Sequence, residues 1–340
     1  MPRSLSVTGE TFPLATPFRI SRGVKTAADV VTVTIAEGGV EGRGESVPYP
    51  RYGESVAGSI AEIEAVRAAI EAGVSRRGLL EILPAGAARN AVDCALWDLE
   101  LRLEGRDFAA ATGIATPLQP IATAMTVGLD TPDNMRLAAA ALADVPLIKV
   151  KVDASDPIAQ LRAVRAAAPG PRMIVDPNES WTIAEVETMQ GLARELRIDL
   201  LEQPLPAGAD DALRGYASVI PIAADESVHV AADLDDLPDG YGVVNIKLDK
   251  AGGLTAALAL AEAARARGLG MMTGCMICSS LSIAPAWAIA ARTDAGSARS
   301  RDRSSAPADT PAGATPARWR PAVTTSAPAP SSAGTSSRPR

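Results

Sequence analysis

The sequence predicts an α/β protein in which a parallel β/α barrel follows an N-terminal α+β unit. Between residues 120 and 290, seven short apolar segments alternate with segments of helical periodicity, which is typical of such a barrel. Over residues 1–115, strands are followed by helices, as in an α+β unit. The chain has 340 residues, enough for a barrel and a smaller second domain.

The elements of the first unit follow from apolar alternation, from turn residues and then from helical spacing. In order we expect strand 5–20, polar loop 20–23, strand 29–46 with a hairpin turn at Gly38-Gly39, loop 48–54, helix 55–72 and helix 87–103. The second helix carries Val92, Leu96, Leu99 and Leu103 at helical spacing, so we expect it to face a core.

The barrel segments are assigned in the same way. We expect strands at 121–127, 147–152, 172–176, 200–204, 220–226, 243–247 and 270–274. We expect helices at 132–143, 158–168, 183–196 and 209–217, then one from Gly252-Gly253 to Arg267 and one at 282–291.

Composition excludes several classes of function. The net charge of −7 gives no support to nucleic-acid binding, and no apolar run approaches the roughly 20 residues of a membrane span. Three cysteines and the lack of a signal peptide predict a cytoplasmic protein, and a homo-oligomer stays open. The single histidine, His229, excludes His-rich zinc sites, and we expect it to be structural or solvated rather than part of a Ser-His-Asp triad. For Cys275 and Cys278, packing is favoured over redox or zinc chemistry.

The strand at 147–152 carries Lys149 and Lys151 on one face. Two ammonium groups in an interior are unfavourable unless anions lie opposite, so an edge strand with a solvated face is the alternative. Residues further along the chain favour a position of this strand in the interior over one at an edge. Lys151 is followed at intervals of 25, 26, 23 and 22 residues by Asp176, Glu202, Asp225 and Lys247, each at a predicted strand end. In a β/α barrel these ends meet at one mouth, where active sites lie.

Three converging carboxylates repel one another, and a hard divalent cation, best Mg²⁺, would resolve that repulsion. Lys151 and Lys247 would then lie on opposite sides of the mouth. A lysine beside a cation and a second ammonium has a lowered pKa and can act as a base. The pattern therefore predicts removal of a proton α to a carboxylate by one lysine and its return to the opposite face by the other, which is racemisation or epimerisation.

These motifs resemble the enolase superfamily, in its muconate-lactonising subgroup, and most closely the L-Ala-D/L-Glu epimerases among the dipeptide epimerases. The resemblance covers about residues 5–290. It is carried by Lys149-Val150-Lys151, Asp176-Pro177-Asn178, Leu201-Glu202-Gln203-Pro204, Ala224-Asp225-Glu226-Ser227, Asn245-Ile246-Lys247, Pro48-Tyr49-Pro50-Arg51-Tyr52-Gly53-Glu54 and Gly274-Cys275-Met276. The use of a Lys base with Mg²⁺ is a known property of that superfamily.

The resemblance implies a (β/α)7β barrel with an N-terminal capping domain that carries the specificity loops. It implies Mg-dependent epimerisation of a dipeptide in murein-peptide recycling. It also implies the following roles: one Mg²⁺ per subunit on Asp176, Glu202 and Asp225; acid/base catalysis by Lys151 and Lys247; the substrate carboxylate on Lys149; the glutamyl side chain on Arg22; and support of the metal site by Asn178. For Arg22, a solvated surface arginine is the alternative.

The C-terminus departs from the family. Residues 293–340 are rich in Ala, Ser, Thr, Pro, Arg and Gly, so we expect a disordered tail, no normal eighth strand and exposed edges on the first and seventh barrel strands. The Asp-x-Asp that binds the substrate ammonium in dipeptide epimerases does not occur there. Two explanations of this segment remain open: a frameshift in the gene near residues 286–294, or a genuine disordered tail on a shortened barrel. We expect a capping domain over 1–115, a barrel over 116–292 and the tail over 293–340.

Several functions remain as alternatives. N-acylamino-acid racemase, o-succinylbenzoate synthase and muconate cycloisomerase share the lysines and the metal ligands. A Schiff-base lysine aldolase on the same barrel is a different class, which the three carboxylates disfavour. An inactive, truncated relative is the non-enzymatic alternative.

Overall fold

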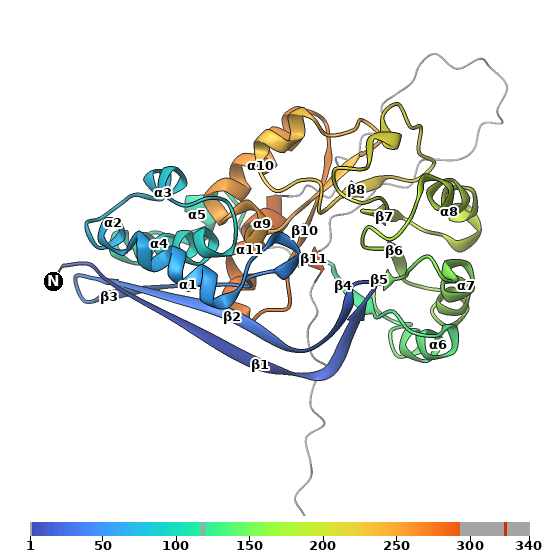
Figure 1. The fold of residues 1–340 in the computed structure, drawn as a ribbon, viewed down its shortest axis with the longest axis horizontal. Helices are drawn as coiled ribbons and strands as arrows, with labels where there is room; N and C mark the ends of the chain where they lie inside the picture. Colours follow the sequence, from blue (N-terminus) through green and yellow to red (C-terminus); the bar gives the residue numbers. More distant parts are fainter. Residues whose placement is uncertain (1, 117–119, 293–322, 325–340) are drawn as a thin grey trace, which may run out of the picture.

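The computed structural model describes residues 2–116, 120–292 and 323–324 of the 340-residue chain. Within these ranges, an antiparallel sheet with its helices lies beside a barrel of parallel strands (Figure 1). No helix in the described part is both long and apolar enough to cross a bilayer.

The N-terminal sheet consists of β1 (Ser4–Ile20), β2 (Gly23–Glu37) and β3 (Val40–Ser46), in that spatial order. Gly38 and Gly39 have φ angles of 60° and 85°, which glycine adopts without strain, so the hairpin turn is where the sequence predicts it. At the other end of the sheet, Ser21 and Arg22 make the β1–β2 turn. Next to this turn, the backbone carbonyl of Arg19 accepts a 3.2 Å hydrogen bond from Leu129 N, which links the hairpin to the barrel.

Five helices and one 3-10 turn complete this unit. They are η1 (Pro50–Tyr52), α1 (Val56–Ala65), α2 (Arg67–Glu71), α3 (Arg76–Ile82), α4 (Ala87–Glu104) and α5 (Phe108–Thr112). Helix α4 lies directly on β3, because Gly42 and Gly44 leave no side chain between them: a Cβ on Gly44 would lie 2.1 Å from Ala91 O. The apolar face that the sequence predicts for α4 is buried against the sheet, with the exception of Leu103, which is 44% exposed.

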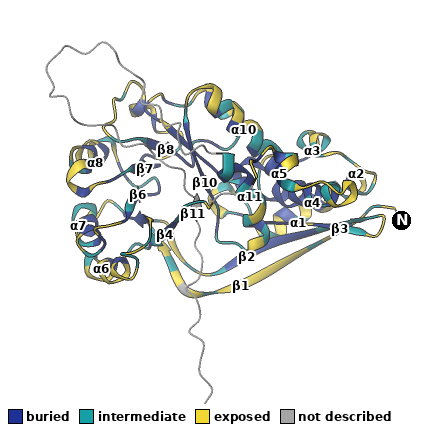
Figure 2. Ribbon diagram, turned by 180° about the vertical axis from the view of Figure 1, so that it is seen from behind, coloured by how far each residue is buried: buried dark blue, intermediate teal, exposed yellow. Residues whose placement is uncertain are grey.

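The seven parallel strands predicted for the barrel are confirmed. They are β4 (Thr123–Val127), β5 (Leu147–Lys151), β6 (Arg172–Asp176), β7 (Leu200–Glu202), β8 (Ile222–Ala224), β9 (Val243–Ile246) and β10 (Gly270–Gly274). Around the barrel lie α6 (Pro132–Ala140), α7 (Pro157–Ala167), α8 (Ile183–Leu196), α9 (Leu248–Ala251), α10 (Leu254–Ala266) and α11 (Ser280–Arg292). Their outward faces are exposed, whereas the strands are buried (Figure 2).

The helix predicted over 209–217 is wrong. That segment contains only the 3-10 turn η2 (Asp211–Leu213), and a second one, η3 (Ala231–Asp235), follows β8. Gly208 and Gly215 have φ angles of 77° and 70° on either side of η2, so the backbone leaves helical geometry at both ends.

The described residues include no normal eighth strand, as the sequence predicts, but the two-residue strand β11 (Val323–Thr324) lies in its place, and the predicted exposure of both barrel edges is wrong at that point. This two-residue strand pairs with Thr273 and Gly274 of β10 and with Thr123 and Ala124 of β4, so the barrel closes at these positions and both edges are covered there. Strand pairing uses backbone groups, which a low-complexity sequence also supplies. The other residues of 293–340, and with them the hypotheses of a disordered tail and a frameshift, lie outside the described residues.

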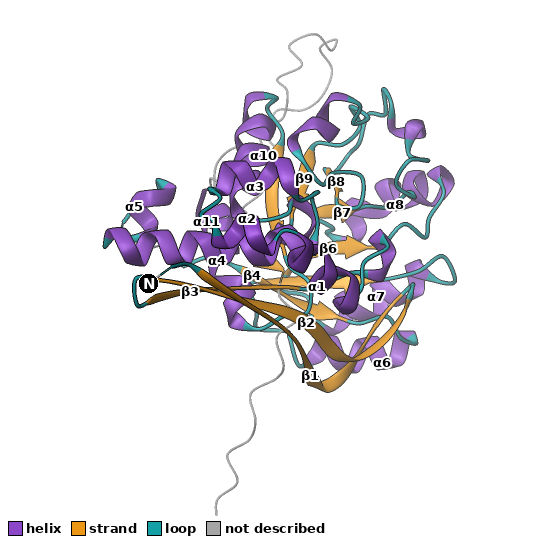
Figure 3. Cartoon of the chain, turned by 60° about the vertical axis from the view of Figure 1, so that its left-hand side comes forward, coloured by secondary structure: helices purple, strands orange, loops and turns teal. Residues whose placement is uncertain are grey.

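A layer of apolar side chains fills the barrel, with one contributed by each of β4 to β10. These are Ala124, Leu147, Ile174, Leu200, Ala223, Val243 and Met272, all buried. Packed layers of this kind close the interior of a β/α barrel. Figure 3 shows the barrel strands behind the N-terminal sheet and its helices, with the β1–β2 hairpin reaching across to the barrel. The layer therefore forms the floor of whatever site lies at the mouth.

Candidate active site

The polar residues of the mouth lie directly above the apolar layer. Lys149, Asp176, Glu202, Asp225 and Asn245 each follow the layer residue of their own strand by two positions. Because side chains alternate along a strand, these residues point into the same interior as the layer. All five are buried. The sequence spacing therefore identified side chains that the fold brings together.

Lys149 and Lys151 contact the same carboxylate. The Oδ2 atom of Asp176 lies 2.7 Å from Lys149 Nζ and 2.6 Å from Lys151 Nζ, and Lys149 also lies 2.7 Å from Glu202 Oε1. Asp176 is the register partner of Lys151 on the neighbouring strand. The edge-strand alternative is wrong, because β5 lies between β4 and β6 and all five of its residues are buried.

Asp225 binds the second catalytic candidate from the far side of the mouth. Lys247 Nζ lies 2.6 Å from Asp225 Oδ2, and Lys250 Nζ lies 2.8 Å from Asp225 Oδ1. Lys250 also donates to the backbone carbonyls of Asp225, Val228 (2.8 Å) and Asn245 (3.1 Å). Lys250 thus fixes the strand ends that carry Asp225 and Lys247, and sequence reasoning gave it no role.

The two lysines proposed as acid and base differ in their electrostatics. Burial lowers the pKa of Lys151; Asp176 opposes that shift and Lys149 adds to it. Burial also disfavours the charge of Lys247, but Asp225, Glu226 and Glu202 outweigh it and raise the pKa of Lys247. The ammonium of Lys149 therefore contributes to the lowered pKa of Lys151.

The carboxylates form a donor set for a hard cation. Among the described residues, no three Asp, Glu, His or Cys side chains already converge as metal ligands. Lysines hold one oxygen of Asp176, one oxygen of Glu202 and both oxygens of Asp225. The buried Glu202 Oε2 has no hydrogen-bond partner within that part of the chain, an arrangement that is unfavourable unless a donor or a cation meets it. Burial raises the pKa of Glu202 to about 7, with Lys149 opposing and Asp176 and Asp225 adding to the shift. An all-oxygen set with one unpaired oxygen fits Mg²⁺.

Asn178 occupies the position predicted for a supporting residue. Its Oδ1 accepts a 2.9 Å hydrogen bond from Lys151, and its backbone N donates a 2.9 Å bond to Asp176 Oδ1. Its φ of 47° is in the left-handed region, which asparagine tolerates better than most residues. Asn178 therefore orients both the first lysine and the first carboxylate.

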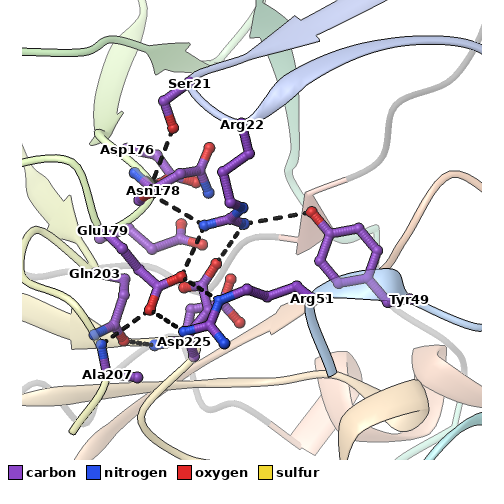
Figure 4. A network of polar contacts seen from close by, with 12 residues as sticks. Ser21, Arg22, Tyr49, Arg51, Asp176, Asn178, Glu179, Gln203, Ala207 and Asp225 are labelled. Atoms are coloured by element: carbon purple, nitrogen blue, oxygen red, sulfur yellow. Dashed lines mark hydrogen bonds and ion pairs between the residues drawn. The ribbon is translucent and has the colours of Figure 1, made fainter. Parts of the chain in front are cut away.

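Arg22 reaches the mouth from the β1–β2 turn and is not a solvated surface arginine. Its Nη1 donates to Asn178 O (3.1 Å) and Glu179 Oε2 (2.9 Å), and its Nη2 donates to Glu226 Oε1 (2.7 Å) and Tyr49 OH (3.4 Å). Its side chain is only 25% exposed. Figure 4 shows Arg22 between Asn178 and Glu179 on one side and Tyr49 on the other.

Glu179 also holds Arg51, which comes from the second N-terminal loop. Arg51 contacts both carboxylate oxygens of Glu179, at 2.9 Å and 2.8 Å, and Ala207 N donates to Glu179 Oε1 at 2.9 Å (Figure 4). Sequence reasoning assigned no role to Glu179, Arg51 or Glu226. The only signal was position, because Glu179 and Glu226 directly follow residues assigned to the metal site and Arg51 lies in a predicted loop.

A cavity of about 480 Å³ opens above these residues, a volume in the range of small-molecule sites. Lys149, Lys151 and Lys247 line its base, while Arg22 and Tyr52 line its N-terminal side. The cavity thus lies between the barrel mouth and the N-terminal loops.

His229 and the cysteines have no place in the acid–base arrangement. The His229 ring packs edge-on against Tyr52, with centroids 4.5 Å apart, and burial lowers its pKa to about 4, so it is structural. Neither Cys275 nor Cys278 is in a disulfide bond; Cys275 lines the cavity and Cys278 packs against an apolar cluster. A hydrogen bond from Cys278 lowers the pKa of Cys275.

Comparisons with known proteins agree with this geometry. Residues 3–109 match the N-terminal domain of the mandelate racemase / muconate lactonizing enzyme family, and residues 134–324 match the enolase C-terminal domain-like family. The L-Ala-D/L-Glu epimerase of Escherichia coli K12 is 47% identical over 286 residues, which cover 84% of this chain and 89% of that protein.

Two solved structures are similar over most of their length. One is an enolase family member from Agrobacterium tumefaciens with homology to dipeptide epimerases, bound to sodium and L-Ala-L-Glu. It has a TM-score of 0.83 and 50% identity, covering 86% of this chain and 89% of that one. The other is the dipeptide epimerase of Methylococcus capsulatus with Mg and L-Arg-D-Lys, with a TM-score of 0.78 and 34% identity, covering 85% and 87%. The chain therefore belongs to the enolase superfamily, in the muconate-lactonising subgroup that contains the dipeptide epimerases.

Proposed function

We propose that this protein is a Mg²⁺-dependent dipeptide epimerase that acts on L-Ala-D/L-Glu. The observation that carries the proposal is the placement of Lys151, at the end of β5, and Lys247, directly after β9, at the base of one cavity, each against a different carboxylate. A substrate Cα held between two lysines can lose a proton on one face and gain one on the other.

Asp176, Glu202 and Asp225 would hold one Mg²⁺ per chain, and the unpaired Glu202 Oε2 supports that assignment. When bound, the cation would draw charge from the substrate carboxylate and make its α-proton more acidic. Asn178 would keep Asp176 and Lys151 oriented. Lys149, between Asp176 and Glu202, would contact the substrate carboxylate.

Lys151 and Lys247 would exchange roles according to the direction of the reaction. The lysine on the side of the α-hydrogen removes it as a base, and the other lysine, already protonated, donates to the opposite face. Arg22 would contact the glutamyl carboxylate, supported by its position over the cavity. The product class fits murein-peptide recycling. None of the three cysteines is in a disulfide bond, which is in keeping with the cytoplasm.

The test is exchange of the glutamyl α-proton in D₂O with Mg²⁺ and L-Ala-L-Glu, followed by NMR. We expect wild-type protein to incorporate deuterium and to form L-Ala-D-Glu. Lys151→Ala and Lys247→Ala should each lose epimerisation by at least about 100-fold, the usual contribution of a positioned acid or base, because one face then lacks its proton carrier. Exchange without epimerisation in wild type would contradict the two-lysine assignment.

N-acylamino-acid racemisation is the second candidate. The observation in its favour is that residues 293–340 contain no Asp-x-Asp, the motif that meets the substrate ammonium in dipeptide epimerases. An N-acyl substrate has no such ammonium. Faster exchange of N-acetylglutamate than of L-Ala-L-Glu under the same conditions would favour this candidate.

A further inference from the structure

The connection between β10 and α11 carries two cysteines, Cys275 and Cys278, which the acid–base arrangement does not use. From the sequence, packing is the favoured role for both. In the structure a hydrogen bond joins their side chains, so the two sulfur atoms lie in contact. Residues 275–279 lie in neither a helix nor a strand, so the backbone between the sulfurs is less constrained than in the flanking elements.

The two thiols are half-buried, but they face different surroundings. Cys275 lines the 480 Å³ cavity. Cys278 is not among the described residues that line the cavity, and it packs against the apolar cluster of Val30, Val47 and Met276. A small molecule in the cavity therefore meets the sulfur of Cys275 first, with that of Cys278 directly behind it.

The surroundings of Cys275 favour its thiolate. The backbone just before it lies against the second catalytic candidate, since a Cβ on Gly274 would be 2.8 Å from Lys247 Cε. The hydrogen bond from Cys278 lowers the pKa of Cys275; burial opposes that shift, and the ammonium groups of Lys247 and Lys149 add to it. The thiolate is the nucleophilic form of a cysteine, so Cys275 combines access with reactivity.

We propose that Cys275 and Cys278 form an oxidation site in the wall of the cavity, at which a hydroperoxide converts the two thiols into a disulfide. Cys275 is the thiol that attacks the peroxide, and Cys278 is the thiol that resolves the product. This inference does not rest on the proposed function, because neither Lys151 nor Lys247 takes part in the chemistry.

The oxidation proceeds in two steps. In the first, the Cys275 thiolate attacks one oxygen of hydrogen peroxide, the O–O bond breaks, and the products are a sulfenic acid and hydroxide, which takes up a proton to form water. In the second, the sulfur of Cys278 attacks that of Cys275; the S–S bond forms, the S–O bond breaks, and the oxygen leaves as water with the Cys278 proton. The two thiols lose two electrons, which the peroxide accepts.

The experiment treats the full chain with hydrogen peroxide and maps each cysteine by mass spectrometry. Remaining thiols are blocked with iodoacetamide in denaturant, and disulfides are then reduced and labelled with N-ethylmaleimide. Trypsin releases both cysteines on one peptide, 268–292, and the third cysteine, Cys94, on another. Cys94 is the internal control, because it is buried, its thiol contacts Asn90 Oδ1 at 3.3 Å, and burial raises its pKa.

We expect Cys275 and Cys278 to gain the second label together, at least about tenfold faster than Cys94, because the buried thiol is rarely a thiolate. In Cys278→Ser, Cys275 should form a sulfenic acid that dimedone traps. In Cys275→Ser, oxidation of Cys278 should slow at least about tenfold, because the attacking thiolate is gone. Circular dichroism melts check that both variants are folded, and the wild-type result does not depend on them.

Three results would overturn the inference. These are oxidation of Cys278 in Cys275→Ser at the wild-type rate, oxidation of all three cysteines at one rate, and disulfides that join two chains on a non-reducing gel in place of the pair within one chain. A chain that forms the disulfide but exchanges no α-proton in D₂O would count against the proposed function alone, because the labels report thiol chemistry.

Discussion

Arg22 and Glu226 are 204 residues apart in the sequence, and in the lining of the cavity they form a 2.7 Å ion pair between Nη2 and Oε1. The pair joins the β1–β2 turn of the N-terminal sheet to the loop that follows β8. The Glu226 side chain is 2% exposed, and burial raises its pKa, with Asp225 adding to the shift. The N-terminal loop thus supplies the cation that a buried barrel carboxylate needs.

From this pair we expect Arg22→Met to lower the free energy of unfolding by about 1–2 kcal/mol, since it leaves a buried carboxylate without its partner. In an Arg22→Met, Glu226→Gln double mutant, the loss should be smaller than the sum of the two single losses. Urea unfolding gives the free energy of unfolding of wild type, of Arg22→Met, of Glu226→Gln and of the double mutant. Arg51→Met is the control: its side chain is 40% exposed, so the loss should stay below about 1 kcal/mol. Additive losses at Arg22 and Glu226 would show that the pair is not coupled.

For the proposed metal site, we expect Glu202→Gln to weaken Mg²⁺ binding at least about tenfold, because an amide replaces the anionic donor whose Oε2 is unpaired. The readout is the rise in melting temperature with Mg²⁺ concentration, which reflects binding to the folded state and does not require activity. Glu195→Gln, at an exposed residue paired with Arg162, should leave the Mg²⁺ dependence unchanged. An unchanged response in Glu202→Gln would remove this residue from the donor set.

Asp93 makes a pH-dependent contribution where the two parts of the molecule meet. On α4, it accepts hydrogen bonds from Thr255 N (2.9 Å) and Thr255 Oγ1 (2.6 Å) at the start of α10. Burial raises the pKa of Asp93 to about 6 from 3.8, although both bonds from Thr255 oppose it. The folded state therefore binds this proton more tightly than the unfolded state, and the contribution to stability falls as the pH rises between these two values.

The expected result is a difference between wild type and Asp93→Asn. The amide that this substitution introduces does not titrate, so the unfolding free energy of wild type minus that of the variant should fall by about 2 kcal/mol from about pH 4.5 to about pH 7.5. Shifts at other groups cancel in this difference. Urea unfolding at several pH values in that range is sufficient, and a difference that rises with pH would show that the pKa of Asp93 is lowered instead.

The approach of α4 to β3 predicts a steric effect. In Gly44→Ala, the new Cβ would lie 2.1 Å from Ala91 O and 2.6 Å from Ala95 N, both backbone atoms that cannot move alone. We expect a loss of about 3 kcal/mol or more in unfolding free energy, at the upper end of overpacking effects. Gly191→Ala is the matched control, because nothing lies within 4 Å of its Cβ position in α8 and alanine favours a helix. That variant should be more stable by about 0.5–1 kcal/mol.

The sequence by itself determined the barrel strands and the residues at their ends. Alternation along a strand is local, so Lys149, Asp176 and Glu202 had to lie on the same side as the apolar residues two positions before them. A repeat of 22 to 26 residues per β/α unit then placed Lys151, Asp176, Glu202, Asp225 and Lys247 at one mouth.

Only the tertiary structure decided which of these charged groups form ion pairs, and which residues of the N-terminal unit contact the barrel mouth. Glu179 and Arg51 are 128 residues apart, and no local pattern links them. Likewise, β11 closes the barrel through backbone hydrogen bonds, which the amino-acid composition of that segment does not reveal. Such relationships depend on the relative placement of distant segments, which packing of the whole fold sets and residue periodicity does not encode.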